Sequence, residues 1–372
     1  MVEWKKLEEV CEILDSQRKP VAKGNRSLGE YPYYGANGIQ DYVDDYIFDG
    51  TFLLLGEDGS VINKDKSPVL HWATGKIWVN NHAHILKEND KAILRYLYYI
   101  LQCTDVSDIV RGMPPKINQA NMRAIMIPIP QFSEQNRIVG ILDTFTSSIE
   151  NLKLQIAERR KQYEHYRDQL LDLEGKEGVE MKTLGGVCEI KGRIGFRGYT
   201  REDQVSKGEG ALTLTATNIV NQRIDYLNNT YITWEKYNES PEIMVNEGDI
   251  IVCQRGSIGK IAIIENLEEK ATINPQLLLL KNIKCNNRYL INYLLSRYFQ
   301  DSLRKIIGHG TVQMIAQKDL KELQIPLIEE EEQSRIVSIL DTFGASILNL
   351  EAQLSQREKQ YEYYRKKLLT FE

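Results

Sequence analysis

Apolar residues recur at alternating steps of four and three in two stretches of the chain, 127–174 and 325–372. A heptad seam of this kind predicts two long helices that wind around a partner helix. Each stretch begins with Ile-Pro, which fits an extended lead-in. At 1.5 Å per residue, a helix of about 38 residues would be roughly 57 Å long. The predicted seam residues are Ile138, Leu142, Phe145, Ile149, Leu152, Ile156 and Tyr163, and, in the second stretch, Ile336, Leu340, Phe343, Ile347, Leu350, Leu354 and Tyr361.

One seam position is polar in both stretches, Arg159 in the first and Arg357 in the second. Either the side chain reaches out to solvent while its stem packs, or a single polar seam residue fixes the register of the helix pair. Both helices belong to one chain with a whole domain between them. We therefore expect them to pair antiparallel and to place the intervening segments at opposite ends of a stiff rod.

The two stretches align without gaps at an offset of 198 residues, and over half of the aligned positions are identical. WKKLEEVCEI, from Trp4, likewise matches MKTLGGVCEI, from Met181, whereas the sequences in between differ strongly. Self-similarity of this kind predicts a tandem duplication with an internal pseudo-twofold repeat. The predicted segments are a first domain, 1–127, a helical region, 128–180, a second domain, 181–325, and a second helical region, 326–372.

The two inserted domains mix strand and helix signals. Runs such as TFLLL, DIIVCQ, KIAII and QLLLLK, broken by Gly and Asn, indicate short strands. The segments 91–102 and 288–307 indicate helices, and they occupy parallel places in the two halves. The predicted fold is α+β: two α/β domains with mixed or antiparallel sheets, joined by two long antiparallel coiled-coil helices.

Composition limits the partners and the compartment. Hydrophobic residues make up 42% of the chain and charged residues 27%, as in soluble globular proteins. There is no apolar run of roughly 18 residues, and the polar start MVEWKKLEEV has no signal-peptide core. Five scattered cysteines without a CxxC motif argue against a disulfide framework, so we expect a reduced, cytoplasmic protein. The net charge of −5 predicts weak nucleic-acid binding by the isolated chain.

No catalytic or nucleotide-binding motif is recognisable in the sequence. The chain lacks a GxxxxGK[ST] phosphate loop and a Gly-rich strand-to-helix fingerprint. It also lacks the Asn/Asp-Pro-Pro-aromatic run of adenine methyltransferases, because MPPK (113–116) has neither flanking residue. The sequence therefore predicts a protein that is not itself an enzyme.

Several segments resemble one known family. The duplicated IPIP…EQ.RIV.ILD segments, each running into a Tyr- and Arg-rich helix, resemble the conserved regions of type I restriction–modification specificity subunits. YYGANGIQDYVDDYIFDGTFLLLGEDGS (33–60) and HWATGKIWVNNHAHIL (71–86) resemble a target-recognition domain of that family. The second domain shows looser similarity over 246–264, 274–281 and 308–328.

The resemblance implies that each target-recognition domain reads one half of a split sequence in double-stranded DNA, and that the helices set the unread spacer. It also implies that the helices carry two methyltransferase subunits and two restriction (motor/nuclease) subunits. S-adenosylmethionine, ATP and Mg would belong to those partners, and this chain would hold no cofactor. Two alternatives stay open: a self-sufficient nuclease or methyltransferase with an unrecognised site, and a coiled-coil scaffold or an inactive or recombined specificity subunit that does not read DNA.

Base-edge readout needs matched donors and acceptors, such as Arg or Lys for guanine and Asn or Gln for adenine. Candidates lie in loops punctuated by Gly and Asn, and RGMPPKIN (111–118) corresponds to HGTVQMIA (309–316) at the offset of 198. In the first domain the candidates are Tyr33, Tyr34, Asn37, Gln40, Trp72, Thr74, Lys76, His82, His84, Arg111, Lys116 and Asn118. In the second domain they are Arg193, Arg197, Tyr199, Arg201, Thr215, Thr217, Asn218, Arg255, Lys260, Asn274, Gln276, His309, Thr311 and Gln313.

Each candidate has a structural alternative. Solvent-facing Lys and Arg usually only solubilise a surface, and Tyr33 and Trp72 suit core or domain packing. His71, His82 and His84 raise the possibility of a metal site, since His-Ala-His on a strand places two imidazoles on one face. No Cys or carboxylate sits at a convincing spacing nearby, so we predict no metal.

The outer faces of the two predicted helices repeat the same polar chemistry. Duplicated exposed groups suit two copies of one partner, and ordinary solvation of a helix surface is the alternative. The repeated residues are Arg137, Asp143 and Thr144, echoed by Arg335, Asp341 and Thr342.

Overall fold

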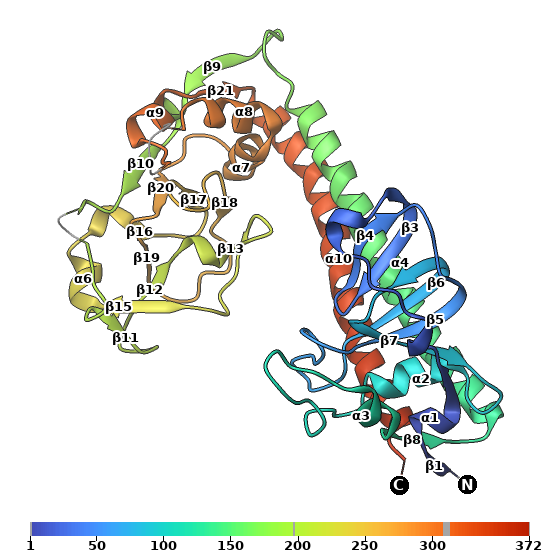
Figure 1. Ribbon diagram of the computed structural model, residues 1–372. Helices are drawn as coiled ribbons and strands as arrows, with labels where there is room; N and C mark the ends of the chain where they lie inside the picture. The colour runs from blue at the N-terminus through green and yellow to red at the C-terminus, as the bar shows by residue number, and fades with distance from the viewer. Residues whose placement is uncertain (1, 196–197, 308–312, 372) are drawn as a thin grey trace. The chain divides into compact units, whose positions relative to one another are not determined.

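A computed structural model describes residues 2–195, 198–307 and 313–371 of the chain (Figure 1). The chain forms two compact units. Unit 1 comprises Met1–Leu154 and Glu351–Glu372, and unit 2 comprises Gln155–Leu350. The predicted helical regions 128–180 and 326–372 are therefore shared, because each unit contains one part of both.

The two long helices predicted from the heptad seams are present. Helix α4 (Phe132–Leu170) has 39 residues and α10 (Glu330–Leu369) has 40. In unit 1 the ring of Phe145 stacks on Tyr364 at 5.3 Å, and Lys153 pairs with Glu358 at 3.3 Å. Residue numbers rise along α4 as they fall along α10, so this part of the pair is antiparallel, as predicted. Neither these two helices nor any other in the described part of the chain has the length and hydropathy needed to cross a membrane.

The predicted seam lies between the helices in both units, and its polar position is specifically paired. Ile138, Leu142, Ile149 and Ile156 are buried on α4, as are Ile336, Leu340 and Ile347 on α10; Phe145, Leu152, Tyr163, Phe343, Leu350, Leu354 and Tyr361 are half-buried. In unit 1 the guanidinium of Arg357 lies 5.6 Å from the ring centre of Phe145. In unit 2 Arg159 lies 5.9 Å from that of Phe343. A repeated cation–π contact across the seam favours the hypothesis that these arginines fix register.

Unit 1 is built on a six-stranded sheet in the order β2-β7-β5-β6-β3-β4 (Figure 1). All neighbours are antiparallel except β3 and β6, so the sheet is mixed, as predicted. Leu53 and Leu55 of β5 pack into one core with α2 (Leu94–Leu101), whereas Leu54 packs into a second core. The strands are β2 (Cys11–Ile13), β3 (Leu28–Gly35), β4 (Gly38–Val43), β5 (Phe48–Gly56), β6 (Leu70–Val79) and β7 (Ala83–Glu88).

Unit 2 contains two larger sheets, ordered β10-β20-β17-β18 and β11-β15-β12-β19-β16. Strand β17 alternates between two cores: Ile250 and Val252 face one, and Ile251 and Cys253 face the other. The strands are β10 (Glu189–Gly192), β11 (Gln204–Val205), β12 (Gly210–Leu214), β15 (Thr230–Thr233), β16 (Met244–Val245), β17 (Ile250–Cys253), β18 (Ile261–Ile263), β19 (Ala271–Ile273) and β20 (Leu277–Lys281). The helices include α6 (Trp234–Asn238), α7 (Asn287–Leu295), α8 (Arg297–Lys305) and α9 (Gln317–Glu322).

The segment 288–307, expected as one helix, forms α7 and α8 with a break at Ser296. Ser296 is extended (φ −67°, ψ 157°) and ends α7, and its hydroxyl donates to the main-chain oxygen of Tyr293 at 2.7 Å. Serine competes for main-chain hydrogen bonds in this way, which is why it often interrupts a helix. The prediction of a helical region was correct, and the prediction of its continuity was wrong.

The duplicated segments form the same local structures in both units. In unit 1, β1 (Glu3–Lys6) pairs with β8 (Met126–Ile129) and leads into α1 (Leu7–Val10). In unit 2, β9 (Glu180–Thr183) pairs with β21 (Gln324–Leu327) and leads into α5 (Leu184–Val187). A buried tyrosine hydroxyl donates at 2.6 Å to a proline carbonyl in each copy, Tyr96 to Pro128 and Tyr289 to Pro326.

A buried glutamine near the start of each long helix bonds two main-chain groups. Gln135 accepts from the amide of Ile93 and donates to the carbonyl of Pro130, both at 2.9 Å. Gln333 does the same with Asn286 at 3.0 Å and Ile328 at 2.8 Å. Each glutamine therefore ties the lead-in of a long helix to the segment that precedes or begins α2 or α7.

Replacing Gln135 with Leu should destabilise unit 1, because the Ile93 amide and the Pro130 carbonyl would lose their partners in a buried site. We expect a loss of about 1–3 kcal/mol in the free energy of unfolding. Urea denaturation followed by the fluorescence of Trp72 and Trp78 would measure it. The exposed neighbour Asn136 is the control, and Asn136→Ala should change stability by less than about 0.5 kcal/mol. Equal effects of the two substitutions would contradict the assignment.

Candidate nucleic-acid interface

Three loops of unit 1 meet at one place, here called the three-loop junction. They follow β5, precede β7, and precede α3 (Gln119–Arg123). The amide of Glu57 donates to the carbonyl of His82 at 2.8 Å, and the amide of Ile117 donates to the carbonyl of Glu57 at 2.8 Å. Asp58 and Lys116 form an isolated β-bridge beside them. Main-chain hydrogen bonds thus join the three loops.

Unit 2 repeats this junction with different side chains. The amide of Gln254 donates to the carbonyl of Gln276 at 2.9 Å. The amide of Ile315 donates to the carbonyl of Gln254 at 3.0 Å. Arg255 and Met314 form the corresponding bridge. The last loop is the one predicted to be equivalent from the alignment of 111–118 with 309–316. The two units therefore share a frame of main-chain bonds in which the exposed chemistry differs.

Several candidate side chains of unit 1 are gathered around its junction. His82 Nδ1 lies 2.5 Å from Asp58 Oδ1, and Lys116 Nζ lies 3.1 Å from Glu57. The side-chain amide of Asn80 donates to the side-chain oxygen of Gln40 at 3.3 Å, which connects β4 to the three-loop junction. Asn37, Gln40, Arg111, Lys116 and Asn118 are exposed and His82 is half-buried. Asn118 also has a structural role, since its side chain caps α3 by accepting from the amide of Asn121 at 2.8 Å.

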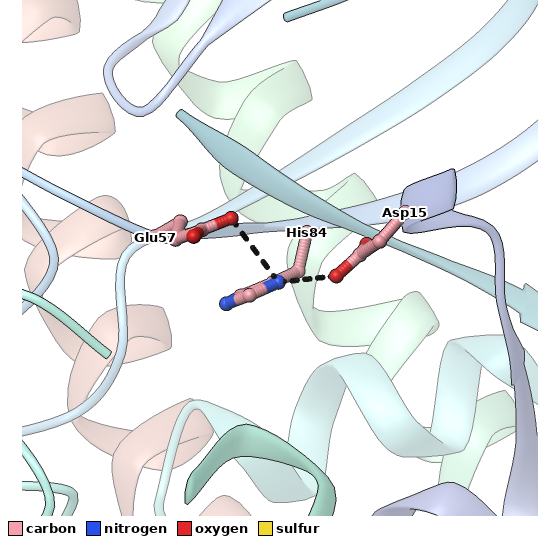
Figure 2. Close-up of side chains that lie close together, drawn as sticks. All are labelled: Asp15, Glu57 and His84. Atoms are coloured by element: carbon pink, nitrogen blue, oxygen red, sulfur yellow. Dashed lines mark hydrogen bonds and ion pairs between the residues drawn. The ribbon is translucent and has the colours of Figure 1, made fainter. Parts of the chain in front are cut away.

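A buried charged network lies beneath this junction. Figure 2 shows His84 between Asp15 and Glu57, with its Nδ1 2.6 Å from Asp15 and 3.6 Å from Glu57. His84 Nε2 lies 2.9 Å from the carbonyl of Ile117. Burial alone would raise the pKa of Asp15, but the hydrogen bond and charge of His84, with Arg18, outweigh it and hold the pKa below its ordinary value. Each ring nitrogen of His84 therefore faces an oxygen atom of the protein.

The chemistry of this network does not suit a metal ion. Both ring nitrogens of His84 already contact protein oxygens, so neither is turned toward a free site for a cation. Arg18 already lies 2.5 Å from Glu57 and 3.5 Å from Asp15, and Lys116 pairs with Glu57 as well. The two carboxylates are thus already paired with two cations, Arg18 and Lys116, which a divalent ion would have to displace. His71 and His82 bind elsewhere, to the Ala36 carbonyl and to Asp58, so the three histidines do not converge.

Six predicted contact residues are buried, and the structure gives them roles in packing or hydrogen bonding. The Tyr33 hydroxyl accepts from the amide of Val21 at 2.9 Å, and Arg26 lies over its ring at 4.0 Å. The Arg193 side chain donates to the carbonyl of Ile273 at 3.2 Å. The six, each exposed by 9% or less, are Tyr33, Tyr34, His84, Arg193, Asn218 and Asn274. The alternative of core packing therefore describes Tyr33 better than base reading does.

The other candidates are spread over several surfaces. Trp72 is half-buried and packs edge-on against Tyr98, with Arg95 5.1 Å from its ring centre. Lys76 Nζ lies 4.5 Å from the ring centre of Tyr46, and Tyr199 is half-buried beside Arg193. Thr74, Arg201, Thr217, Arg255, Lys260, Gln276 and Gln313 are exposed, and Thr215 is half-buried. Arg197, His309 and Thr311 lie outside the described residues.

One exposed hairpin in unit 2 was not predicted from the sequence: β13 (Ile219–Val220) pairs with β14 (Arg223–Ile224). Its two-residue turn consists of Asn221 (φ +50°) and Gln222 (φ +65°). Positive φ at both positions is typical of a type I′ turn, in which Asn-Gly is the usual signal. Gln222 in place of glycine hid that signal. Thr215 and Asn218 brace the preceding turn, and Lys260 Nζ donates to the Ile219 carbonyl at 3.3 Å.

The repeated polar residues of the long helices divide into two kinds. Asp143 accepts from Arg95 at 2.7 Å and from the Tyr99 hydroxyl at 2.5 Å, and Asp341 pairs with Arg288 at 3.2 Å. These aspartates therefore tie α4 to α2 and α10 to α7, contrary to the expectation of an open partner surface. Thr144 and Thr342 donate to carbonyls of their own helices at 2.7 Å and 2.9 Å. Arg137 and Arg335 are exposed, each 2.6 Å from a glutamate of the same helix.

Glu57→Gln should destabilise unit 1 by about 1–3 kcal/mol at pH 7, because it removes the partner of Arg18 and Lys116. Burial would raise the pKa of Glu57, but Arg18, His84 and Lys116 lower it below the ordinary 4.5. The stabilisation is therefore complete above about pH 4.5 and is lost as the pH falls through the folded-state pKa. Urea unfolding at several pH values should show a constant difference from wild type down to about pH 5 and a shrinking one below. Exposed Glu12, 3.7 Å from Lys87, gives the control Glu12→Gln. A difference that persists unchanged to about pH 3 would argue against the network.

A family model described as the type I restriction modification DNA specificity domain matches residues 1–159 and 176–358. A putative type I restriction enzyme specificity subunit of Haemophilus influenzae is 33% identical over 386 residues, with 100% of this chain and 96% of the relative covered. The EcoR124I/EcoR124II specificity subunit of Escherichia coli is 29% identical, with 100% and 98% covered. The fold is similar to that of a type I restriction–modification S subunit from M. genitalium (TM-score 0.62, 16% identity), which covers 100% of this chain and 97% of that one. The chain therefore belongs to the type I restriction–modification specificity subunits, and it is a recognition component rather than a catalytic one.

Proposed function

We propose that each unit reads one half of a split sequence in double-stranded DNA, using the side chains carried by its three-loop junction. The observation that supports this most directly is that both junctions have the same main-chain hydrogen bonds but carry different side chains. Asp58, His82 and Lys116 in one unit stand where Arg255, Gln276 and Met314 stand in the other. Two readers of different half-sites need this combination: the same positioning of loops and different groups at the base edges.

The exposed side chains at the junctions have the chemistry that base reading requires. Arg255 and Lys116 are donors suited to the acceptors of guanine, and Gln276, Gln40 and Asn37 match the adenine edge. All five are exposed on the structure. The buried network of Asp15, Glu57, His84 and Arg18 then positions the reading loops of unit 1 and does not read bases itself.

We infer that the two long helices serve the assembly rather than the reading. Type I specificity subunits are named as parts of restriction enzymes, so complex formation with methyltransferase and restriction subunits is expected for this chain. The repeated exposed residues Arg137 and Arg335 suit two copies of one partner. S-adenosylmethionine, ATP and Mg would be bound by those subunits. The net charge of −5 supports the same picture, because an acidic chain gains DNA affinity when a basic partner completes the binding surface.

The central test is to map methylated bases in cells that co-express this chain with its cognate methyltransferase subunit. We expect a new methylated motif made of two unlike halves around a fixed spacer. Cells with the methyltransferase alone are the control and should lack the motif. Exchanging residues 1–127 for those of a relative should change one half only. A stable complex without new methylation would count against reading and would favour the scaffold or an inactive subunit.

The turn of the β13–β14 hairpin offers a finer test within unit 2. The left-handed conformation of Gln222 costs about 1 kcal/mol of conformational free energy, whereas glycine adopts it freely. Gln222→Gly should therefore raise stability slightly and alter or weaken the half-site read by unit 2, measured as a changed methylated motif. Asn266, also left-handed (φ +57°) in unit 2, gives the matched control Asn266→Gly, which should leave the motif unchanged. An unchanged motif in Gln222→Gly would exclude the hairpin turn from reading.

A further inference from the structure

A cationic cavity in unit 2 lies beside the β13–β14 hairpin. Its volume is about 740 Å³, and its walls come from α4, α8, the hairpin and the start of β18. Strand β14 lies close to β18, and the hairpin turn itself, Asn221 and Gln222, lines the cavity. The charged side chains that line it are Arg167, Lys260, Arg297 and Arg304, with Glu164 and Asp168 as the acids.

Arg167 is the buried member of this set. Its residue is 5% exposed, and its Nε and Nη2 each lie 3.2 Å from Oδ1 of Asp168. The same carboxylate oxygen accepts from the main-chain amide of Arg297 at 3.2 Å, at the start of α8. Nη1 of Arg167 is buried and has no hydrogen-bond partner. A guanidinium nitrogen left without an acceptor is costly in a protein interior.

The other three cations stand at the open side of the cavity. Lys260, Arg297 and Arg304 are all exposed. Arg297 donates to the hydroxyl of Tyr298 at 2.8 Å, and Arg304 pairs with Asp301 on its own helix. Asp301 offsets part of the charge of Arg304, and when it is included the cations at the cavity still outnumber the acids by four to three.

The equivalent place in unit 1 shows that this charge is not a general property of the fold. Arg365 corresponds to Arg167 at the offset of 198 and lines a cavity of about 620 Å³. Its Nη2 lies 2.7 Å from Glu362. The charged lining of that cavity is balanced, since Arg365 and Lys366 face Asp65 and Glu362. Only in unit 2, of these two equivalent cavities, do cations outnumber acids.

We propose that the cavity of unit 2 binds a phosphate group of the DNA backbone, next to the bases that face the hairpin turn. The inference rests on the proposed function and adds a contact that positions the duplex. Guanidinium groups bind phosphate oxygens through paired N–H donors, and such contacts fix register without reading sequence. The neighbouring Asn221–Gln222 turn favours DNA over an acidic protein surface, because its two amide side chains suit base edges and stand on the same surface.

The test removes the two exposed arginines of α8 that line the cavity, in the variant Arg297→Gln/Arg304→Gln, and keeps Lys260 because its Nζ bonds the hairpin carbonyl of Ile219. The matched control, Lys191→Gln/Lys207→Gln, removes the same charge from unit 2 outside the cavity. Each full-length chain is purified with its methyltransferase subunit, and its affinity for a fluorescent duplex bearing the methylated motif is measured by anisotropy from 50 to 300 mM KCl. Arg167→Met is measured in parallel as a second variant. The double variant tests the proposal even if Arg167→Met does not fold.

We expect the cavity variant to bind several-fold more weakly and its slope of log affinity against log salt to fall by about 1, as for one lost phosphate contact. Its preference for the motif over an unrelated duplex should stay as in wild type. A slope equal to that of the control would overturn the proposal while leaving DNA reading intact. Loss of the complex with the methyltransferase, without a change in slope, would overturn it in favour of an acidic protein partner. Absence of DNA binding by the wild-type complex would instead remove the proposed function, and this inference with it.

Discussion

The whole arrangement depends on fastening each long helix to a domain, and two buried glutamines do this. Gln135 and Gln333 use both ends of their amides to bond main-chain groups on two sides, at a point where the chain passes from β8 or β21 into α4 or α10. A hydrophobic contact could hold the same segments together but would not fix their direction, because burial is non-directional. The tyrosine–proline bonds and the Asp143 and Asp341 contacts add further fixed points on the same helices.

Beyond these fixed points, each unit separates what is constant from what varies. Main-chain hydrogen bonds join the loops of both junctions, and in unit 1 side-chain pairs such as Lys116 with Glu57 add to them. Unit 1 then adds a charged layer below the loops, whereas unit 2 adds an exposed hairpin and a cationic cavity. The two units thus use different means to support and extend the same frame, which fits a protein whose halves bind different sequences.

The features that were predictable from sequence were local or repeated. Heptad spacing located α4 and α10 to within a few residues, and the duplication located their shared lead-ins. The functional surface was harder, because it depends on contacts between segments far apart in the chain. The sequence around His82 and His84 gives no reason to separate the two. In the structure His84 is buried between Asp15 and the Ile117 carbonyl, whereas His82 is half-buried. Asp143 was expected on the open helix face because periodicity cannot show that Arg95 reaches it. The hairpin was missed because Gln222 occupies a position where the usual signal is glycine.

The main-chain frame of the three-loop junction also has a consequence for diversification. Since the bonds between Glu57 and His82, and between Gln254 and Gln276, use only amides and carbonyls, they are indifferent to side-chain identity. Substitutions at the exposed positions of such loops cost little folding free energy. Substitutions within a buried side-chain network would destabilise the fold. The junction of unit 2 is therefore a natural scaffold for a combinatorial library, in which positions such as 255 and 276 could be randomised while the fold stays constant.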